Sequence, residues 1–212
     1  MSRIKITLLL LVFVLLIGLV FFLQFMWSHH TVTFNNPDNI TLNIRKSIDG
    51  VNQKQIEHVV KNSIDIGFQN GDYCAEVEST TYDTTPLCFT VNNKDISVSV
   101  DLGYSKTKLA DLLLQESTTI RSLITQTYSD VIGDFTIADG VMYGRGDWYG
   151  TTLTKKVAYK SEQGDVYRVL LKKSDGKWNI LAYPQIVLSK YDYPVVPIHI
   201  LKNVNKLTGT RT

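Results

Sequence analysis

A serine and a lysine three residues apart form the motif in this chain that most resembles a catalytic nucleophile. Ser105 and Lys108 match S-x-x-K, in which a lysine activates a serine hydroxyl, and they lie where a helix is expected to begin. The accompanying motifs S-D-N and K-T-G do not fit, because residues 174–176 read as a turn and residues 206–209 lie in the tail. We therefore expect Ser105 to cap the helix and Lys108 to lie in solvent.

Arg145-Gly146-Asp147 is a tripeptide that mediates adhesion when a loop displays it. Here it lies between Tyr143 and Trp148, in a pattern typical of a strand. Glycines within a strand indicate a bulge or close packing. We therefore expect the tripeptide to be structural.

The four histidines do not form a metal-binding pattern. His29 and His30 are adjacent and follow an apolar run, which suits a linker at a membrane interface, while His58 and His199 are isolated. Two cysteines without nearby histidines would leave zinc under-coordinated. We expect neither a metal site nor a cofactor.

Cys74 and Cys88 are the two cysteines of the chain, and we expect them to form a disulfide. The bond would close a loop of about 15 residues, for which chain entropy gives roughly 3 kcal/mol. Residues 83–86 between them read as a turn. The alternative is a pair of unbonded thiols.

Five aromatic residues are candidates for lining a small apolar pocket between a helix and a sheet. The alternative is that they fill the core and pair across strands. These residues are Tyr143, Trp148, Tyr149, Tyr167 and Trp178.

The N-terminal segment reads as a membrane anchor. Residues 6–26 are apolar on all sides and at helical rise would span about 30 Å, the thickness of a bilayer core. A cleaved signal peptide has a shorter apolar region followed by small residues, and this segment has neither feature. Arg3 and Lys5 precede the run, so the N-terminus is expected in the cytoplasm and the remainder outside it.

The charge balance argues against a nucleic-acid partner. The formal net charge is +2, and Arg3 and Lys5 account for it, which leaves 20 basic and 20 acidic residues. A nucleic-acid-binding domain usually carries a dense basic patch. The expected partners are instead the bilayer, through residues 6–27, and another protein of the cell envelope.

The first half of the outer region is predicted to contain one helix and several strands. Alternating apolar residues over 31–34 and 40–44, with a turn between them, predict a β-hairpin. Apolar residues at helical spacing predict a helix over 51–68. Residues 72–78 and 87–101 look extended, with a hairpin joining 89–91 to 96–100.

The second half is predicted to be a helix followed by a four-strand meander. The helix covers 105–128, where residues at helical spacing form one face. They are Leu109, Leu112, Leu113, Glu116, Ile120, Leu123, Ile124 and Thr127. Candidate strands cover 140–149, 151–160, 164–173 and 177–188, and their short connections require antiparallel pairing. An extended arm with a short helical turn follows, and the tail is expected to fray.

Several segments near the C-terminus resemble single-anchor membrane proteins of candidate-phylum bacteria such as Saccharibacteria. They are residues 148–153, 175–178 and 184–201, within about the last 70 residues. The resemblance implies a bacterial envelope setting and no particular activity.

Together these patterns predict an α+β protein with an N-terminal transmembrane helix and an outer domain of two helices on a curved antiparallel sheet. The element order resembles cystatin-like or nuclear-transport-factor-like architectures, which carry no function by themselves. The expected segments are a cytoplasmic tail (1–5), a transmembrane helix (6–27), a juxtamembrane hairpin (28–50), one domain (51–206) and a flexible tail (207–212).

Three functional hypotheses follow for the outer region. The leading one is a non-enzymatic module that binds another envelope protein. The second is a small-ligand-binding domain with a pocket between helix 105–128 and the sheet. The third is a hydrolase that uses Ser105, or carboxylates such as Asp101 and Asp147.

Overall fold

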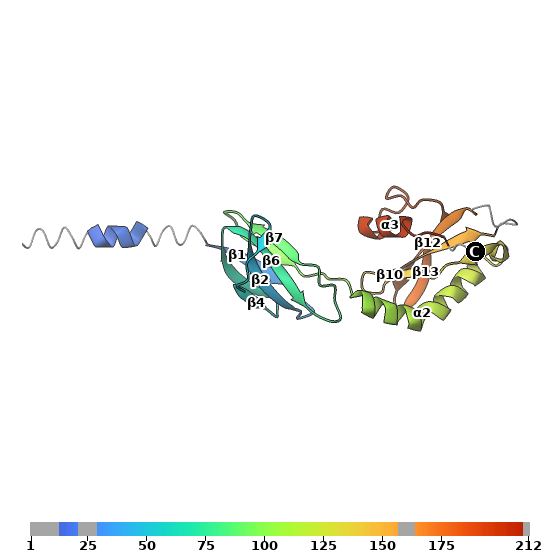
Figure 1. Cartoon of the computed structure of the whole chain (residues 1–212), viewed down its shortest axis with the longest axis horizontal. Coiled ribbons are helices and arrows are strands. Elements are labelled where there is room, and N and C mark those ends of the chain that lie inside the picture. Colours follow the sequence, from blue (N-terminus) through green and yellow to red (C-terminus); the bar gives the residue numbers. More distant parts are fainter. Residues whose placement is uncertain (1–12, 21–28, 157–163, 210–212) are drawn as a thin grey trace, which may run out of the picture. The chain divides into compact units, whose positions relative to one another are not determined.

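The computed structural model describes residues 13–20, 29–156 and 164–209 (Figure 1). It divides the chain into two compact units. Unit 1 holds the chain up to Ser79 together with Thr84–Asp101, and unit 2 holds Thr80–Asp83 together with everything from Leu102 onward. The expectation of a single domain over 51–206 is therefore wrong, since the boundary falls within that range.

The N-terminal segment is described only in part. Residues 13–20 are helical, whereas 6–12 and 21–27 of the expected transmembrane helix lie outside the described residues. Within the described part of the chain, no helix has the length and apolar character needed to cross a bilayer.

Unit 1 is built from two β-sheets. One sheet has the order β5 (Ile64–Gln69), β1 (His29–Asn35), β8 (Ile96–Ser99), with β1 and β8 parallel. The second sheet has the order β3 (Val51–Asn52), β2 (Thr41–Ile48), β6 (Gly71–Glu78), β7 (Leu87–Val91), and β4 (His58–Val60) also pairs with β2.

Aromatic side chains join the two sheets of unit 1. Phe34 of β1 and Phe68 of β5 are buried, and both rings lie 5.7 Å from the ring of Phe89 on β7. Tyr73 of β6 is 4.9 Å from Phe68 in an edge-to-face arrangement. The inner faces of the two sheets therefore share one core, as in a β-sandwich.

The two hairpins predicted in unit 1 are wrong, although their strands exist. β1 and β2 are consecutive but belong to opposite sheets, and so do β7 and β8. The connection after β1 is fixed by the buried Asn36, whose side chain donates to the carbonyl of Ile40 (2.8 Å) and accepts from its N–H (3.1 Å). An alternating pattern specifies which face of a strand is buried but not which strand it pairs with.

The helix predicted over 51–68 is also wrong, because this segment forms β3, β4 and β5. Val51 and Val59, assigned to the apolar face of that helix, are 65% and 52% exposed, whereas Phe68 is buried. Over 64–69 the apolar residues also recur at every second position, and β-branched residues with a glycine favour a strand over a helix. Both periods fitted the same residues, and packing decided between them.

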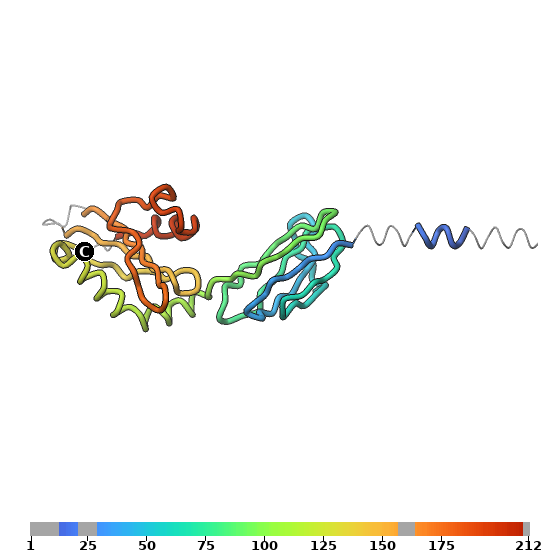
Figure 2. The backbone as a smooth tube through the Cα atoms, turned by 180° about the vertical axis from the view of Figure 1, so that it is seen from behind, coloured from blue at the N-terminus to red at the C-terminus, as the bar shows by residue number. Residues whose placement is uncertain are grey.

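Unit 2 is an α+β unit in which an antiparallel sheet lies between helices (Figures 1 and 2). The sheet order is β10 (Val141–Tyr143), β11 (Trp148–Lys155), β12 (Val166–Ser174), β13 (Lys177–Gln185), and β9 (Phe135–Ile137) also pairs with β11. Helix α2 (Lys106–Thr127) is followed by a 3₁₀ turn (Ile132–Asp134), and α3 (Ile198–Asn205) comes near the C-terminus.

The two faces of this sheet have separate cores. On the α2 side, Ile120 and Ile124 pack with Tyr149, Leu171 and Trp178. The opposite core combines sheet residues with residues of α3 and of the segment before it. Its buried members are Trp148, Leu170, Ala182, Leu188, Val196, Ile200, Leu201 and Val204.

The predicted helix over 105–128 and the meander after it are confirmed in their main features. Ser105 caps α2, and its hydroxyl accepts from the N–H of Lys108 (3.3 Å). The hairpin between β12 and β13 turns at Asp175 and Gly176, both with positive φ (52° and 75°), as a type I′ turn requires.

Two details of the meander and the tail differ from expectation. The strand predicted over 140–149 is divided by a turn at residues 144–147. Leu207 and Thr208 are held to the sheet, because their carbonyls accept from Arg168 (3.2 Å) and Thr152 (3.4 Å). Of the tail expected to fray, residues 207 and 208 are therefore anchored, and 210–212 lie outside the described residues.

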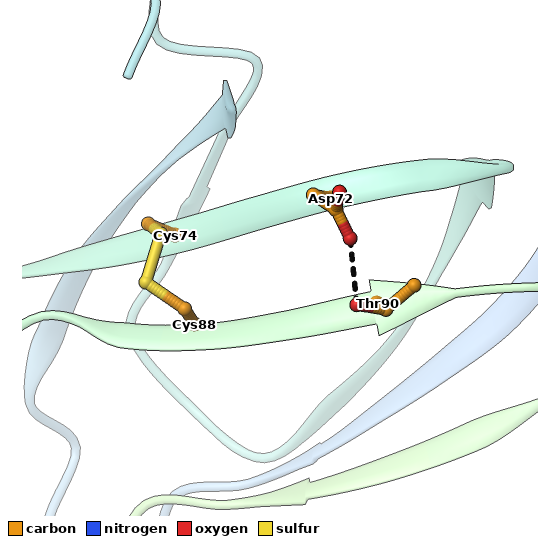
Figure 3. The surroundings of a disulfide bond; sticks show 4 residues. All are labelled: Asp72, Cys74, Cys88 and Thr90. Carbon is orange, nitrogen blue, oxygen red and sulfur yellow. Dashed lines mark hydrogen bonds between the residues drawn. A yellow bond between two sulfur atoms is a disulfide. The ribbon is translucent and has the colours of Figure 1, made fainter. Parts of the chain in front are cut away.

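The predicted Cys74–Cys88 disulfide is confirmed (Figure 3). The two residues lie directly opposite each other on β6 and β7, with their Cα atoms 4.0 Å apart. Their neighbours Asp72 and Thr90 are joined by a side-chain hydrogen bond of 2.6 Å. Because Tyr73 and Ala75 point into the sandwich, the disulfide lies on the outer face of its sheet.

Replacing both cysteines by serine should destabilise unit 1 by up to about 3 kcal/mol, since the bond constrains the unfolded state. Amide exchange of peptides from β6 and β7 should become faster. In a Trp27→Phe background the two remaining tryptophans both lie in unit 2, so the unfolding midpoint followed by tryptophan fluorescence should not move. Equal destabilisation of the two units would contradict the expectation that they unfold separately, and the unsubstituted protein in reductant is the control.

Candidate functional site

The five aromatic residues expected to line one pocket are divided between the two faces of the unit 2 sheet. Tyr149 and Trp178 are buried beneath α2, with Tyr167 packed against them, whereas Trp148 and Tyr143 belong to the opposite core. Burial raises the pKa of Tyr143 to about 12. These residues therefore form no common cavity. Their positions agree with the alternative, in which they fill the cores.

A carboxylate fastens α2 to the sheet. Glu116 accepts a hydrogen bond from the ammonium of Lys173 on β12 (2.5 Å) and one from the indole N–H of Trp178 on β13 (2.9 Å). Its side chain is 26% exposed. These two donors lower the pKa of Glu116, the Lys173 hydrogen bond being the larger cause. The arrangement satisfies both oxygens and favours the ionised form.

Two shallow hollows lie beside Glu116. One, of about 420 Å³, is lined by the cations Lys108, Arg145 and Lys173 and by the carboxylates of Glu116 and Asp147. The other, of about 580 Å³, runs along α2 past Trp178. Their volumes are suited to small ligands, but both linings mix charged and polar groups with apolar ones, unlike the aromatic pocket expected from the sequence.

The hydroxyl of Ser105 takes part in two structural hydrogen bonds. It donates to the carbonyl of Thr80 (2.8 Å) as well as accepting from the N–H of Lys108. A nucleophilic serine instead gives its proton to a base, and the proton of Ser105 is directed at a carbonyl oxygen. This geometry favours a helix cap over a catalytic residue.

The Arg145-Gly146-Asp147 tripeptide is also structural, although it lies in a turn and not in a strand bulge. The guanidinium of Arg145 donates to the carbonyl of Leu102 (3.1 Å), and a carboxylate oxygen of Asp147 accepts from the N–H of Arg145 (3.1 Å). A Cβ at Gly146 would lie 2.7 Å from a methyl group of Leu112 on α2. The turn is therefore packed against its own unit and not displayed.

Exposed apolar side chains gather in residues 186–197, the arm that joins β13 to α3. Four of them are in the arm itself, and Tyr183 and Ile198 flank it. Their exposed fractions are Tyr183 68%, Ile186 60%, Val187 61%, Tyr191 94%, Val195 71% and Ile198 52%.

The arm has a defined conformation despite these exposed residues. The Asn205 side chain pairs with both backbone groups of Leu188, donating at 2.8 Å and accepting at 2.9 Å. The ammonium of Lys190 donates to the carbonyls of Pro194 and Val196 at 2.6 and 2.7 Å. Leu188 and Val196 are themselves buried. The exposed apolar groups are thus presented on a preorganised backbone.

The strand that leads into the arm lies at the edge of its sheet. β13 pairs with β12 on one side, and the described part of the chain provides no strand on the other. A free edge offers backbone donors and acceptors to an added strand. The arm and this edge together are the candidate functional site.

The described residues contain no group of histidine, cysteine and acidic side chains able to hold a metal ion. No family model, curated protein or solved structure matches this chain.

Sequence reasoning missed both Glu116 as a tie and the arm as a site. A carboxylate at an apolar-face position of a helix was the signal for the tie, because a buried-facing charge requires a partner. The arm gave no periodic signal, and the sequence alone did not indicate that its valines and tyrosine would be exposed.

Replacing Glu116 by glutamine should remove the charge of the pair with Lys173 and lower stability at neutral pH by about 1 kcal/mol. Because the folded pKa of Glu116 lies below its usual value of 4.5, its stabilisation is present above that value and is lost as pH falls through the folded pKa. Denaturant unfolding at pH 7 and near pH 3 should therefore show the difference shrinking in acid. The exposed Asp111→Asn on the same helix is the control, and an E116Q difference that persists in acid would contradict the assignment.

Proposed function

We propose that this chain is a membrane-anchored protein whose two folded units lie outside the cytoplasm and bind another protein of the cell envelope. The apolar run over residues 6–26, with positive residues before it, supports the anchor and its orientation. The Cys74–Cys88 disulfide agrees with an oxidising compartment.

The observation that carries protein binding is the arm beside the free edge of β13. Groups of exposed apolar side chains mark interaction surfaces on proteins, and six large ones lie from Tyr183 to Ile198. Here the backbone is fixed by Asn205 and Lys190, so little conformational entropy is lost when a partner binds. The partner that suits this surface is an extended segment with apolar side chains, which adds to the edge of β13 and packs on the arm.

The alternative of a small-ligand-binding domain has the two hollows beside Glu116 in its favour. Of the aromatic residues expected to line a pocket, only Trp178 lines one of these hollows, and Tyr149 and Trp148 are buried in the two cores. The hydrolase alternative has weaker support, since the Ser105 hydroxyl caps a helix and donates to a carbonyl. Protein binding is therefore the function that the surface supports best.

The anchor and its orientation have a direct test. The full chain with a C-terminal epitope, expressed in bacteria, should stay in the membrane pellet after an alkaline carbonate wash. Protease added to spheroplasts should remove the epitope while a cytoplasmic marker survives. Release by carbonate, or protection of the epitope until the cells are lysed, would overturn the proposal.

Partner binding should depend on the exposed side chains of the arm. Val187→Asp combined with Val195→Asp should reduce recovery of cross-linked partner at least tenfold, because each new carboxylate would have to be desolvated in the interface. The melting temperature should change little, since both side chains are exposed.

Leu114→Asp is the matched control for the arm variant. Leu114 lies on α2 and is 79% exposed, so the change places one of the two carboxylates of the arm variant at a similarly accessible apolar residue away from the arm. The L114D variant should retain the partner in detergent extracts. Equal recovery with both variants, or recovery of the unsubstituted protein alone as a monomer, would contradict the proposed surface.

A further inference from the structure

One end of unit 1 carries both the start of its first strand and an exposed apolar hairpin. β1 begins at His29, which pairs with Gln69 at the end of β5. The chain then turns into β6, whose Asp72 pairs with Ser47 of β2. The β2–β3 hairpin continues beyond that pair, so its tip lies at the His29 end of the sandwich.

The residues that flank the turn of this hairpin are apolar, although the turn itself does not require apolar residues there. Ile48 pairs with Val51 around Asp49 and Gly50, whose φ angles of 53° and 78° indicate a type I′ turn. The turn of the same type between β12 and β13 is flanked by Ser174 and Lys177. Asp-Gly alone specifies the turn, so the flanking residues are free to be polar.

Both flanking residues of the tip are accessible to solvent within unit 1. Ile48 is 51% exposed and Val51 is 65% exposed. Moving apolar side chains at the end of a hairpin out of water lowers the free energy in proportion to the area buried. These two side chains contribute little to the core of unit 1. They would be stabilised further if an apolar medium outside the unit covered them.

The nearest apolar medium follows from chain connectivity. The apolar run ends at Met26, and three residues of chain reach at most about 10 Å to His29. Facing sheets of a sandwich are also about 10 Å apart. If residues 6–26 cross a bilayer, the His29 end of unit 1 faces the headgroup layer, and the hairpin tip lies within reach of it.

Unit 1 leaves the other end free for its connections to unit 2. β6 runs from Gly71 to Glu78, away from the His29 end, and is followed by the passage to Thr80. β8 runs parallel to β1 and ends at Ser99, again away from that end. The chain thus enters unit 1 at the His29 end of the sandwich and leaves toward unit 2 at the opposite end.

We propose that the Ile48–Val51 hairpin tip inserts its two apolar side chains into the interfacial layer of the bilayer that holds the anchor. This inference rests on the proposed membrane anchor and adds a lipid surface as the partner of the hairpin. The tip and its surroundings carry Lys46 and Lys54 but also Asp49 and Asp72, so the contact depends on apolar burial and not on anionic lipid. Insertion gives unit 1 a second attachment point and fixes its tilt on the membrane.

Depth-dependent fluorescence quenching tests the contact in the full-length protein. Val51→Trp, in a background with Trp27, Trp148 and Trp178 replaced by phenylalanine, is reconstituted into phosphatidylcholine liposomes with chain-brominated lipid. The tryptophan at 51 should lose at least twice as large a fraction of its fluorescence as one introduced by Val59→Trp. Val59 is 52% exposed on β4, opposite Asn43 and farther from the tip.

Further measurements keep the two proposals separate. Ile48→Trp should reproduce the quenching if the V51W variant fails to fold, and 30% phosphatidylglycerol should change neither result. Quenching at 51 no greater than at 59, in protein that resists carbonate extraction, would overturn the hairpin contact and leave the anchor standing. Release of the protein by carbonate would overturn both.

Discussion

The sheet of unit 2 is buried on both faces, and most features of that unit follow from this constraint. Neighbouring residues of a strand point to opposite sides, so Trp148 enters one core while Tyr149 enters the other. One long helix can cover only one face. The second face requires α3 and the arm, and the arm becomes ordered because Leu188 and Val196 are needed in that core.

The same constraint explains why α2 carries a carboxylate on its inner side. Lys173 and Trp178 bring an ammonium and an indole N–H to the margin of the α2 core, and both donors require an acceptor. Glu116 supplies two oxygens from one side chain. A leucine at this position would bury more apolar area but leave the indole N–H without its acceptor, so the tie also fixes where the helix lies along the sheet.

The predictable parts of the fold are those that local chemistry determines. Ser105 before a periodic apolar stretch specified the start of α2, and Asp175-Gly176 specified the turn between β12 and β13. The Cys74–Cys88 bond followed from the cysteine count and the expected oxidising compartment. Each of these signals acts within a few residues or needs no knowledge of which strands are neighbours.

The parts that could not be predicted depend on contacts between distant strands. The strand patterns before and after Asn36 were correct, but nothing in them says that β1 joins β5 and β8 while β2 joins β6. The segment over 51–68 satisfied a helical period as well as a strand period, and only the partners of Phe68 in the sandwich core decide between them. The arm was not predicted as a site for a related reason, because the solvent exposure of a side chain depends on the complete tertiary fold.

The exposed apolar residues of the two units have a common logic. Each unit already has a core, so the side chains of Ile48, Val51, Val187 and Val195 are not remnants of a core left unfilled. They also lie on rigid supports, namely a type I′ hairpin and an arm held through Asn205 and Lys190. Apolar groups fixed in this way cannot collapse onto their own unit. The water that covers them is released only when another surface covers them instead. Under the function proposed above, one such surface would face the membrane and the other a protein partner, so the chain would bridge the two.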